Sequence, residues 1–468
     1  MSISRRSFFA GSAAAGLTAA GAQTAAAKPR HISSAVAAGA QLPALSEDGM
    51  VAMPPGFKAH RIGTIGVEPL LSDRGGRVVG VTPSNLDGMG AFDRAGVTRL
   101  VRNHECRANA KVPVPLVPGT VHDAGCPTGM GGNTVVEVSR SGELVQQWVG
   151  LSGTIRNCAG GTTPWGSWLA CEETTERAGQ TVTSSVDGQA YTLQKDHGYV
   201  FEVFPEPVAQ QIPLPIKAWG RAVWEGAEIG ADLSSAYLTE DTKGGLFYRW
   251  TAPQGVTLRP GIATQLGEDD GVLQAAQLVR DGVALEHYGQ LTEADLDVAH
   301  PVRWVDGGAD RQAQTTDLRQ QFPGATTHRK IEGVWSDDAG EGLWFTLSTV
   351  KDGEHPEAVA NQGMIMYYSF AEQTMTLKEY WAVGSCFDAP DNITVSPWGG
   401  VVIAEDGSDP NHLVAFTERA GSSALAKDLA ERGEWAGPCF GGGRALFANI
   451  QSDCTYMITG PMAKQLHR

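Results

Sequence analysis

Short stretches in which apolar and polar residues alternate, separated by glycine turns, recur along most of the chain. Residues 134–138 and 143–149 flank a Ser-Arg-Ser-Gly turn, which predicts a β-hairpin. The same alternation returns in five further segments, residues 198–203, 245–250, 342–347, 364–370 and 400–404. Hairpins spread over roughly 400 residues favour a propeller over a single sandwich, which is usually shorter. We therefore predict an all-β fold, a β-propeller of about six blades with additional loops and a few short helices.

Helical patterns are rare in this sequence. Ala and Leu recur at helical spacing over residues 423–432, and a second helical signal covers residues 291–298. The strand segments resemble one another only weakly, so no strict sequence repeat fixes the number of blades. An elongated protein of several sandwiches is the structural alternative. No Pro-rich or Ser-rich linker divides residues 56–468, which we therefore interpret as one domain.

The N-terminus has the features of an export signal. Arg5 and Arg6 precede a mildly apolar run of Ala, Gly and Leu, and small residues up to position 27 offer a cleavage site. Paired arginines predict the twin-arginine route, with its export machinery as a partner and a periplasmic or secreted location. The alternative is an Ala-rich tail. Residues 28–55 lack helical periodicity and are predicted to form a leader arm.

Composition excludes several function classes. The 468 residues include 52 acidic and 36 basic side chains, a formal net charge of −16, which argues against nucleic-acid binding. After the N-terminus no run of about 18 apolar residues lacks charge, so we expect no stable membrane insertion. Seven cysteines occur without a C-x-x-C pair, which argues against a zinc knuckle or a thioredoxin-type motif. At least one thiol must stay unpaired, either buried or as a metal ligand.

The densest candidate site lies in residues 156–173. An Asn-Cys pair at Cys158 is followed by a glycine turn, an aromatic strand and the adjacent carboxylates Glu172 and Glu173. A thiolate favours iron, copper or zinc, whereas carboxylates suit calcium and ferric iron. Taken alone, Cys158 is also compatible with a packed core residue, and the two glutamates with a solvated strand end.

Other acidic residues adjoin apolar strands in the same way. Glu225 stands between an apolar residue and a glycine, Glu332 lies at a predicted strand entry, and Asp391 lies in the Pro-Asp-Asn segment that precedes Ile393. A carboxylate next to an apolar strand is costly to desolvate unless it is paired or bound to a cation. Several such loops therefore indicate a shared metal cluster.

The order of these motifs resembles a known family. Asn-His-Glu at residues 103–105 is followed by the long cysteine motif, by residues 195–203 and by Pro-Asp-Asn at 390–392. This succession is similar to the PhoX-type alkaline phosphatases, over roughly residues 85–460. The resemblance implies a monomeric β-propeller that is exported by the twin-arginine route. It also implies a cluster of two ferric and three calcium ions with a bridging oxo group.

The resemblance also assigns site residues. It implies that Cys158 binds iron and that Glu225 and Glu332 bind the cluster. Further carboxylate ligands would be Glu172, Glu173 and Asp391. The implied cofactors are thus iron (Fe³⁺) and calcium.

Three positions depart from the family pattern. Lys330 stands where the family has an arginine that grips phosphate, and Arg329 lies one step earlier; we take both as catalytic contacts to phosphate. Because lysine offers a compact point charge whereas the guanidinium of arginine can donate two parallel hydrogen bonds, the binding of phosphate should differ. Trp224 stands where the family usually has histidine. Cys158 is followed by Ala-Gly-Gly rather than Ala-Asn-Gly, which suggests a sister branch.

The function implied is hydrolysis of small-molecule phosphate esters, by an oxo or hydroxide nucleophile of the cluster. The chain would be a phosphoric monoester hydrolase, with phosphodiesterase activity as a second expectation. Two alternatives stay open. A calcium-dependent lactonase or sugar-ester hydrolase would use the carboxylates but not Cys158, and a non-catalytic propeller would bind a partner through its Trp-rich loops.

Overall fold

The structure, a computed structural model, describes residues 42–126 and 130–467, all within one compact unit, Ser34–Arg468. The predicted signal, residues 1–27, lies outside the described residues. Regular structure in this unit is almost entirely β, and α2 (Met462–Leu466) is the one α-helix among the described residues. No described helix combines the length and the apolar character needed to cross a membrane. The all-β prediction is confirmed.

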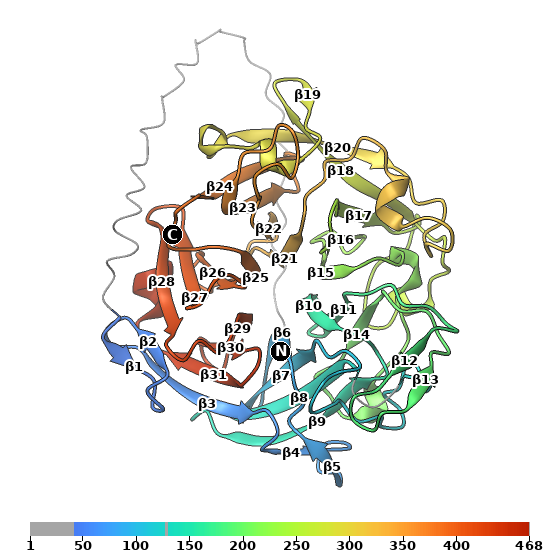
Figure 1. Cartoon of the computed structure of the whole chain (residues 1–468), viewed down its shortest axis with the longest axis vertical. Coiled ribbons are helices and arrows are strands. Elements are labelled where there is room, and N and C mark those ends of the chain that lie inside the picture. Colours follow the sequence, from blue (N-terminus) through green and yellow to red (C-terminus); the bar gives the residue numbers. More distant parts are fainter. Residues whose placement is uncertain (1–41, 127–129, 468) are drawn as a thin grey trace, which may run out of the picture. The chain divides into compact units, whose positions relative to one another are not determined.

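Six inner strands form a closed ring around one centre (Figure 1). Each packs against the next along the chain, and the last packs against the first. In chain order they are β6 (Leu86–Arg94), β10 (Asn157–Thr162), β15 (Trp224–Ile229), β21 (Ile331–Ser336), β25 (Pro390–Val395) and β29 (Trp435–Gly441).

Each inner strand starts an antiparallel sheet that extends outward, as in a propeller blade. The strands that follow β6 are β7 (Val97–His104), β8 (Gly132–Ser139) and β9 (Leu144–Ser152), with β4 (Pro69–Leu71) and β5 (Val78–Val81) at the edge. Those that follow β10 are β11 (Trp168–Glu172) and β14 (Val200–Val203), and those that follow β15 are β16 (Ser235–Glu240), β17 (Phe247–Thr251) and β18 (Val272–Arg280). Those that follow β21 are β22 (Gly342–Leu347), β23 (Asn361–Ser369) and β24 (Thr374–Ala382). Those that follow β25 are β26 (Val401–Glu405), β27 (His412–Thr417) and β28 (Gly421–Asp428), and those that follow β29 are β30 (Ala445–Ile450) and β31 (Cys454–Thr459).

One extra strand changes the count of separate sheets. β20 (Ala299–Asp306) pairs with both β18 and β24, so two blades merge into a ten-stranded sheet. The hydrogen-bonded sheets around the centre therefore number five, while the inner strands number six. The remaining short elements are β12 (Thr181–Thr183), β13 (Ala190–Thr192), β19 (Val283–Ala284) and the 3₁₀ turns η1 (Val208–Gln210), η2 (Lys217–Trp219), η3 (Ala263–Gln265), η4 (Tyr288–Gln290), η5 (Glu293–Asp295) and η6 (Leu318–Gln321).

Strands from the N-terminal end complete the last two blades. β3 (Lys58–Thr64) pairs with β31, and β2 (Val51–Met53), which also pairs with β1 (Ala44–Leu45), joins β28. Hydrogen bonds between the two ends of the chain thus close the ring. β1 and β2 fall within the predicted leader arm, and Val51 and Met53 are buried. The folded domain therefore begins before residue 56.

The helix prediction for residues 423–432 is wrong, because β28 occupies most of this segment. Ala424, Leu425 and Ala426 are all buried, so both faces of the strand are covered and its apolar residues run without alternation. Such a run cannot be told from a buried helix by periodicity. In residues 291–298 the only regular helix is the single turn η5. The hairpin predicted around residue 140 is confirmed as β8 and β9.

Candidate metal centre

A β-bulge interrupts every inner strand at the same place in its blade. The register shifts across residues 87–88 of β6, and the equivalent shift occurs in β10, β15, β21, β25 and β29. A bulge re-aims a side chain, and here it turns the first bulged residue toward the centre of the ring. These first residues are Asp87, Cys158, Glu225, Glu332, Asp391 and, in the sixth strand, Gly437.

The second bulged residue is small in most blades because the bulges touch one another. A Cβ on Gly88 would lie 2.5 Å from the Cα of Ala159, and one on Gly333 would lie 2.8 Å from the Cα of Asn392. Side chains at these positions would force the inner strands apart. The glycine of each recurrent acid-glycine pair is therefore required by packing, and the acid before it faces the pocket.

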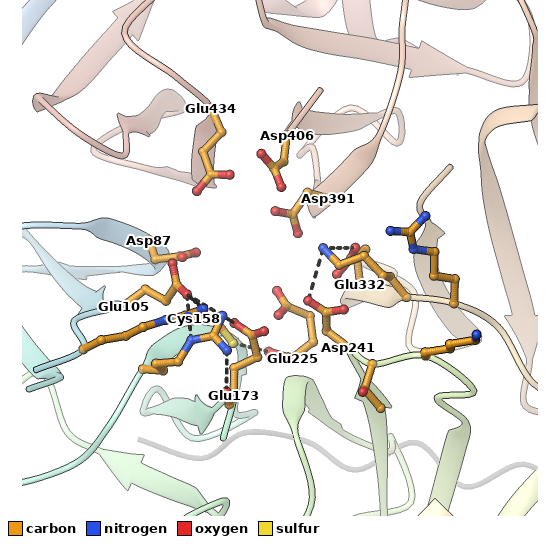
Figure 2. A pocket seen from close by; sticks show the side chains of 16 residues that line it. Asp87, Glu105, Cys158, Glu173, Glu225, Asp241, Glu332, Asp391, Asp406 and Glu434 are labelled. Atoms are coloured by element: carbon orange, nitrogen blue, oxygen red, sulfur yellow. Dashed lines mark hydrogen bonds and ion pairs between the residues drawn. The ribbon is translucent and has the colours of Figure 1, made fainter. Parts of the chain in front are cut away.

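The bulged side chains open into one pocket of about 430 Å³ at the centre of the ring. Figure 2 shows acidic side chains from several blades converging on a common space. Five basic residues, Arg107, Arg156, Lys243, Arg329 and Lys330, also line it, together with Cys158 and Thr242. The carboxyl residues of the lining are Asp87, Glu105, Glu173, Glu225, Asp241, Glu332, Asp391, Asp406 and Glu434.

The ligand atoms in this pocket are close enough to hold several cations. Four groups of three residues each offer donor atoms that lie within 4.8 Å of one another. Glu225, Asp391 and Glu434 each belong to two groups, so the four groups form one continuous cluster. The groups are Cys158–Glu173–Glu225, Glu225–Glu332–Asp391, Asp391–Asp406–Glu434 and Asp87–Glu105–Glu434.

Too little positive charge surrounds the carboxyl groups of the pocket for all of them to be ionised at the same time. Burial, followed by the charges of Asp391 and Glu332, raises the pKa of Glu225 well above its usual range. Burial and the charge of Glu105 raise the pKa of Asp87 to about 8. Bound cations would reverse these shifts, since opposite charge favours the ionised form. The donor set of one thiol and many carboxylates fits iron together with calcium.

Two basic side chains already neutralise part of the cluster. The Lys330 ammonium lies 3.0 Å from a carboxylate oxygen of Glu332 and 3.2 Å from one of Asp241. The charge of Glu332 accordingly raises the pKa of Lys330 above its ordinary value. Arg156 pairs with Glu173 and, at 2.7 Å, with Glu105. Lys330 and Arg156 therefore reach into the acidic part of the pocket.

Arg329 is held less tightly than Lys330. Its Nε lies 3.5 Å from a carboxylate oxygen of Glu354, and 35% of its side chain is exposed. Both predicted catalytic residues thus line the pocket, Lys330 paired with two acids of the lining and Arg329 with Glu354 outside it.

Cys158 is almost completely buried at the first bulged position of β10. Its Sγ donates to the Trp224 carbonyl at 3.2 Å, and, like the other six cysteines, it forms no disulfide. Burial and the charge of Glu225 raise the pKa of the Cys158 thiol. The indole of Trp224 packs against Tyr248 and its Nε1 donates to Gly220, so this side chain belongs to the core and does not line the pocket.

The structure places one predicted ligand, Glu172, away from the pocket. Its Oε1 accepts from His197 Nδ1 at 2.6 Å and from the Ile155 amide at 2.9 Å. Its Oε2 accepts from the amides of Gly198 and Tyr199 at 2.8 and 3.2 Å. The other five predicted ligands, Cys158, Glu173, Glu225, Glu332 and Asp391, come together in the pocket.

Sequence reasoning missed several lining residues. Glu105 lies in the Asn-His-Glu motif but was assigned no role, and the patterns described above do not identify Asp87, Asp241, Asp406 or Glu434. Asp87 could have been found, because Asp87-Gly88 repeats the acid-glycine pair of residues 225–226 and 332–333. Glu434 precedes β29 and has no such signal.

Comparisons with known proteins agree with this geometry. A sequence model of the family described as alkaline phosphatase PhoX matches residues 41–453. No curated protein sequence matches the chain significantly. Among solved structures, PhoX of Pseudomonas fluorescens in complex with vanadate, a transition state analogue, is 17% identical, covers 90% of this chain and 98% of its own, and superposes with a TM-score of 0.63.

Two gluconolactonases are more distant. XC5397 of Xanthomonas campestris is 13% identical, covers 81% of this chain and 86% of its own, and has a TM-score of 0.34. The periplasmic enzyme PpgL of Pseudomonas aeruginosa is also 13% identical, covers 82% and 91%, and has a TM-score of 0.35. At TM-scores this low the likeness supports no conclusion about this chain.

Proposed function

The chain belongs to the family of PhoX alkaline phosphatases, and from this premise we propose that it hydrolyses phosphate monoesters in the central pocket. The observation that carries the proposal is the cluster of nine carboxyl groups and one thiol around the centre of the ring, of which Asp87, Cys158, Glu225, Glu332 and Asp391 stand on equivalent bulges. Bound cations would allow these acids to be ionised together, and cations are what an anionic ester requires. The related P. fluorescens enzyme was solved with vanadate bound.

The residues present suit an iron and calcium cluster. Cys158, Glu173 and Glu225 would hold iron, since a thiolate prefers iron to calcium. The groups made of carboxylates alone would hold calcium. When bound, these ions supply an activated nucleophile and positive charge for the phosphate oxygens.

Basic residues of the chain then position the substrate. Lys330 reaches the middle of the pocket, and we propose that its ammonium contacts a phosphate oxygen, with Arg329 as a second contact. Both would offset the charge that spreads over the phosphoryl oxygens in the transition state. As a point charge, Lys330 should orient the phosphate less strictly than a bidentate arginine would.

Metal analysis and an ester assay together test this function. Purified protein should contain iron and calcium, and it should release p-nitrophenol from p-nitrophenyl phosphate. A ferric thiolate also absorbs visible light, so the protein should be coloured. Zinc without iron would contradict the cluster, and hydrolysis of a lactone with no turnover of the phosphate ester would indicate a lactonase instead.

We further propose that the protein acts as a monomer after export to the periplasm. The support is the paired arginines of residues 5–6, which lie outside the described part of the structure. Replacing both with lysine should retain the protein in the cytoplasm. Normal periplasmic accumulation of that variant would show that residues 4–9 are not the export signal.

A further inference from the structure

Two basic residues that line the pocket, Lys243 and Arg329, form no ion pair with the carboxylates of the acidic cluster. Lys243 is exposed, and within residues 42–126 and 130–467 no carboxylate lies within ion-pair distance of its ammonium. Arg329 has one long ion pair, 3.5 Å to Glu354. By contrast, Arg156 and Lys330 pair with cluster acids at 3.0 Å or less. The edge of the pocket therefore carries positive charge that a ligand can still use.

These two side chains stand on adjacent, linked segments. The turn after β16 that carries Lys243 ends at Gly245, which forms an isolated antiparallel bridge with His328. The His328 amide donates to the Gly245 carbonyl at 3.0 Å. The bridge brings the turn of Lys243 next to residues 329 and 330. The ion pair from Lys330 to Asp241 is a second link between these two segments.

The backbone of this turn is fixed by its glycines. Gly244 has a φ of +79°, and a Cβ on Gly245 would lie 2.2 Å from the carbonyl oxygen of Glu240. The Gly245 amide also donates to the Thr242 carbonyl at 2.8 Å. Lys243 is thus a mobile side chain on a well-defined backbone, which is suitable for reaching a charged group near the pocket mouth.

The size and charge of the pocket indicate what that group is. About 430 Å³ lies within the range of roughly 300–1,000 Å³ that takes a whole small molecule rather than a single phosphate. The acids in the depth of the pocket are the candidate ligands of the cations that would hold the first phosphate, so a second phosphate of the same substrate would lie nearer to the pocket edge. There it would meet the ammonium of Lys243, which is unpaired among the described residues.

We propose that Lys243 binds the second phosphate of a bisphosphorylated substrate whose first phosphate lies at the metal centre. The preferred substrates would then be small phosphate esters that carry two phosphate groups. This inference rests on the proposed phosphatase function and adds a substrate class to it.

Paired substrates with the same type of ester bond test the subsite. We would measure kcat/KM for fructose 6-phosphate and for fructose 1,6-bisphosphate, whose phosphates are all esters of primary alcohols, in the wild type and in Lys243→Ala. The ratio of kcat/KM for the bisphosphate over the monophosphate should fall about tenfold in the variant, through KM, and Lys243→Arg should restore it. The wild-type ratio should also fall as salt concentration rises, because exposed charges are screened.

Lys464→Ala is the matched control. It removes one exposed lysine of α2, which does not line the pocket, and should keep the wild-type ratio. An equal loss of kcat/KM for both esters in Lys243→Ala would mean general electrostatic steering and would overturn the subsite, as would an unchanged ratio. Absence of hydrolysis of either ester by the wild type would instead overturn the proposed function, and the subsite with it.

Discussion

Glu172 and Glu173 are adjacent in the chain and both are buried, yet they belong to two opposite kinds of acidic region. Glu172 lies in a network in which protein donors satisfy the carboxylates. Glu173 faces the pocket, where carboxylates face one another. Burial and the charge of Asp241 raise the pKa of Glu173 well above its usual range, whereas that of Glu172 is lowered.

The network around Glu172 balances its own charge. Although burial opposes it, the charge of His197 holds the pKa of Glu172 below its ordinary value. His197 Nε2 in turn lies 3.4 Å from Asp123, whose Oδ2 also accepts from the amides of Gln194 and Lys195. No further cation is needed there.

The difference shows how a metal centre can be recognised when no ion is present. Burial alone does not separate the two regions, because both contain fully buried carboxylates. What separates them is whether donors from the protein match the negative charge. The pocket has nine carboxyl groups, and only Arg156 and Lys330 pair with them closely. An unmatched set of this kind either stays partly protonated or binds cations, which makes it a candidate metal centre.

The largest expected effect separates a metal ligand from a core residue within the pocket itself. Cys158→Ser replaces a soft thiolate with a hydroxyl that ionises far less readily, so iron content should fall and turnover of p-nitrophenyl phosphate should drop by orders of magnitude. Cys171→Ser is the matched control, because Cys171 is buried on the neighbouring strand β11 but does not line the pocket. Elemental analysis, activity and melting temperature would be compared.

The opposite outcome for Cys158 is equally specific. If the thiol only fills the core, serine should cost about 1–3 kcal/mol through a poorly satisfied buried hydroxyl. Full iron content with a lowered melting temperature would therefore refute the ligand role.

The next effect should differ in sign between the two regions. In metal-free protein, Glu225→Gln removes one of several mutually repelling acids whose pKa is raised, and should therefore stabilise the fold at neutral pH. Glu172→Gln unpairs His197 and should destabilise it by about 3 kcal/mol. Urea unfolding after chelation measures both. A loss of stability in both variants would mean that the pocket acids are already balanced without metal.

The sequence predicted which residues belong to the acidic regions better than it predicted where each of them lies. The propeller class could be predicted from strand patterns, and five of the six predicted ligands do lie in the pocket. Glu172 was expected beside them but lies outside the pocket, because two adjacent glutamates look alike in a sequence. Which of them faces the pocket depends on where β11 ends and on the distant donor His197.

The ring of bulges could not be foreseen for a related reason. A bulge is a mismatch between paired strands, so it has no signal within one strand. Only the acid-glycine pairs, such as those at Asp87 and Glu225, leave a trace in the sequence. The missing sixth member, Gly437, obscures the repeat, and Glu434 supplies an acid from outside the strand.

A smaller effect should appear in the pH dependence of the free energy of unfolding, through the network around Glu172. Burial opposes it, but the charge of Glu172 and the hydrogen bond to Asp123 raise the pKa of His197 from 6.5 to about 9. The folded state then holds a proton that the unfolded state has lost, so the stability that His197 contributes is complete below pH 6.5 and declines as pH rises to about 9. In His197→Gln this decline should be absent. Because His197 also sets the pKa of Glu172 and Asp123, the difference between the two unfolding curves measures this network as a whole; parallel curves would contradict the prediction.

The smallest effect concerns Glu228, a buried carboxyl of β15 that belongs to neither region. Its Oε2 accepts from Ser336 Oγ at 2.7 Å, and it does not line the pocket. Burial raises the pKa of Glu228 from 4.5 to about 8, so the folded state binds a proton that the unfolded state releases, and stability falls as pH rises through this window. Glutamine keeps the shape and does not titrate. Glu228→Gln should therefore match the wild type near pH 4.5 and have a larger free energy of unfolding than the wild type at pH 8. A variant that is less stable at pH 8 would mean that an unseen cation or donor compensates this carboxylate, as in the pocket.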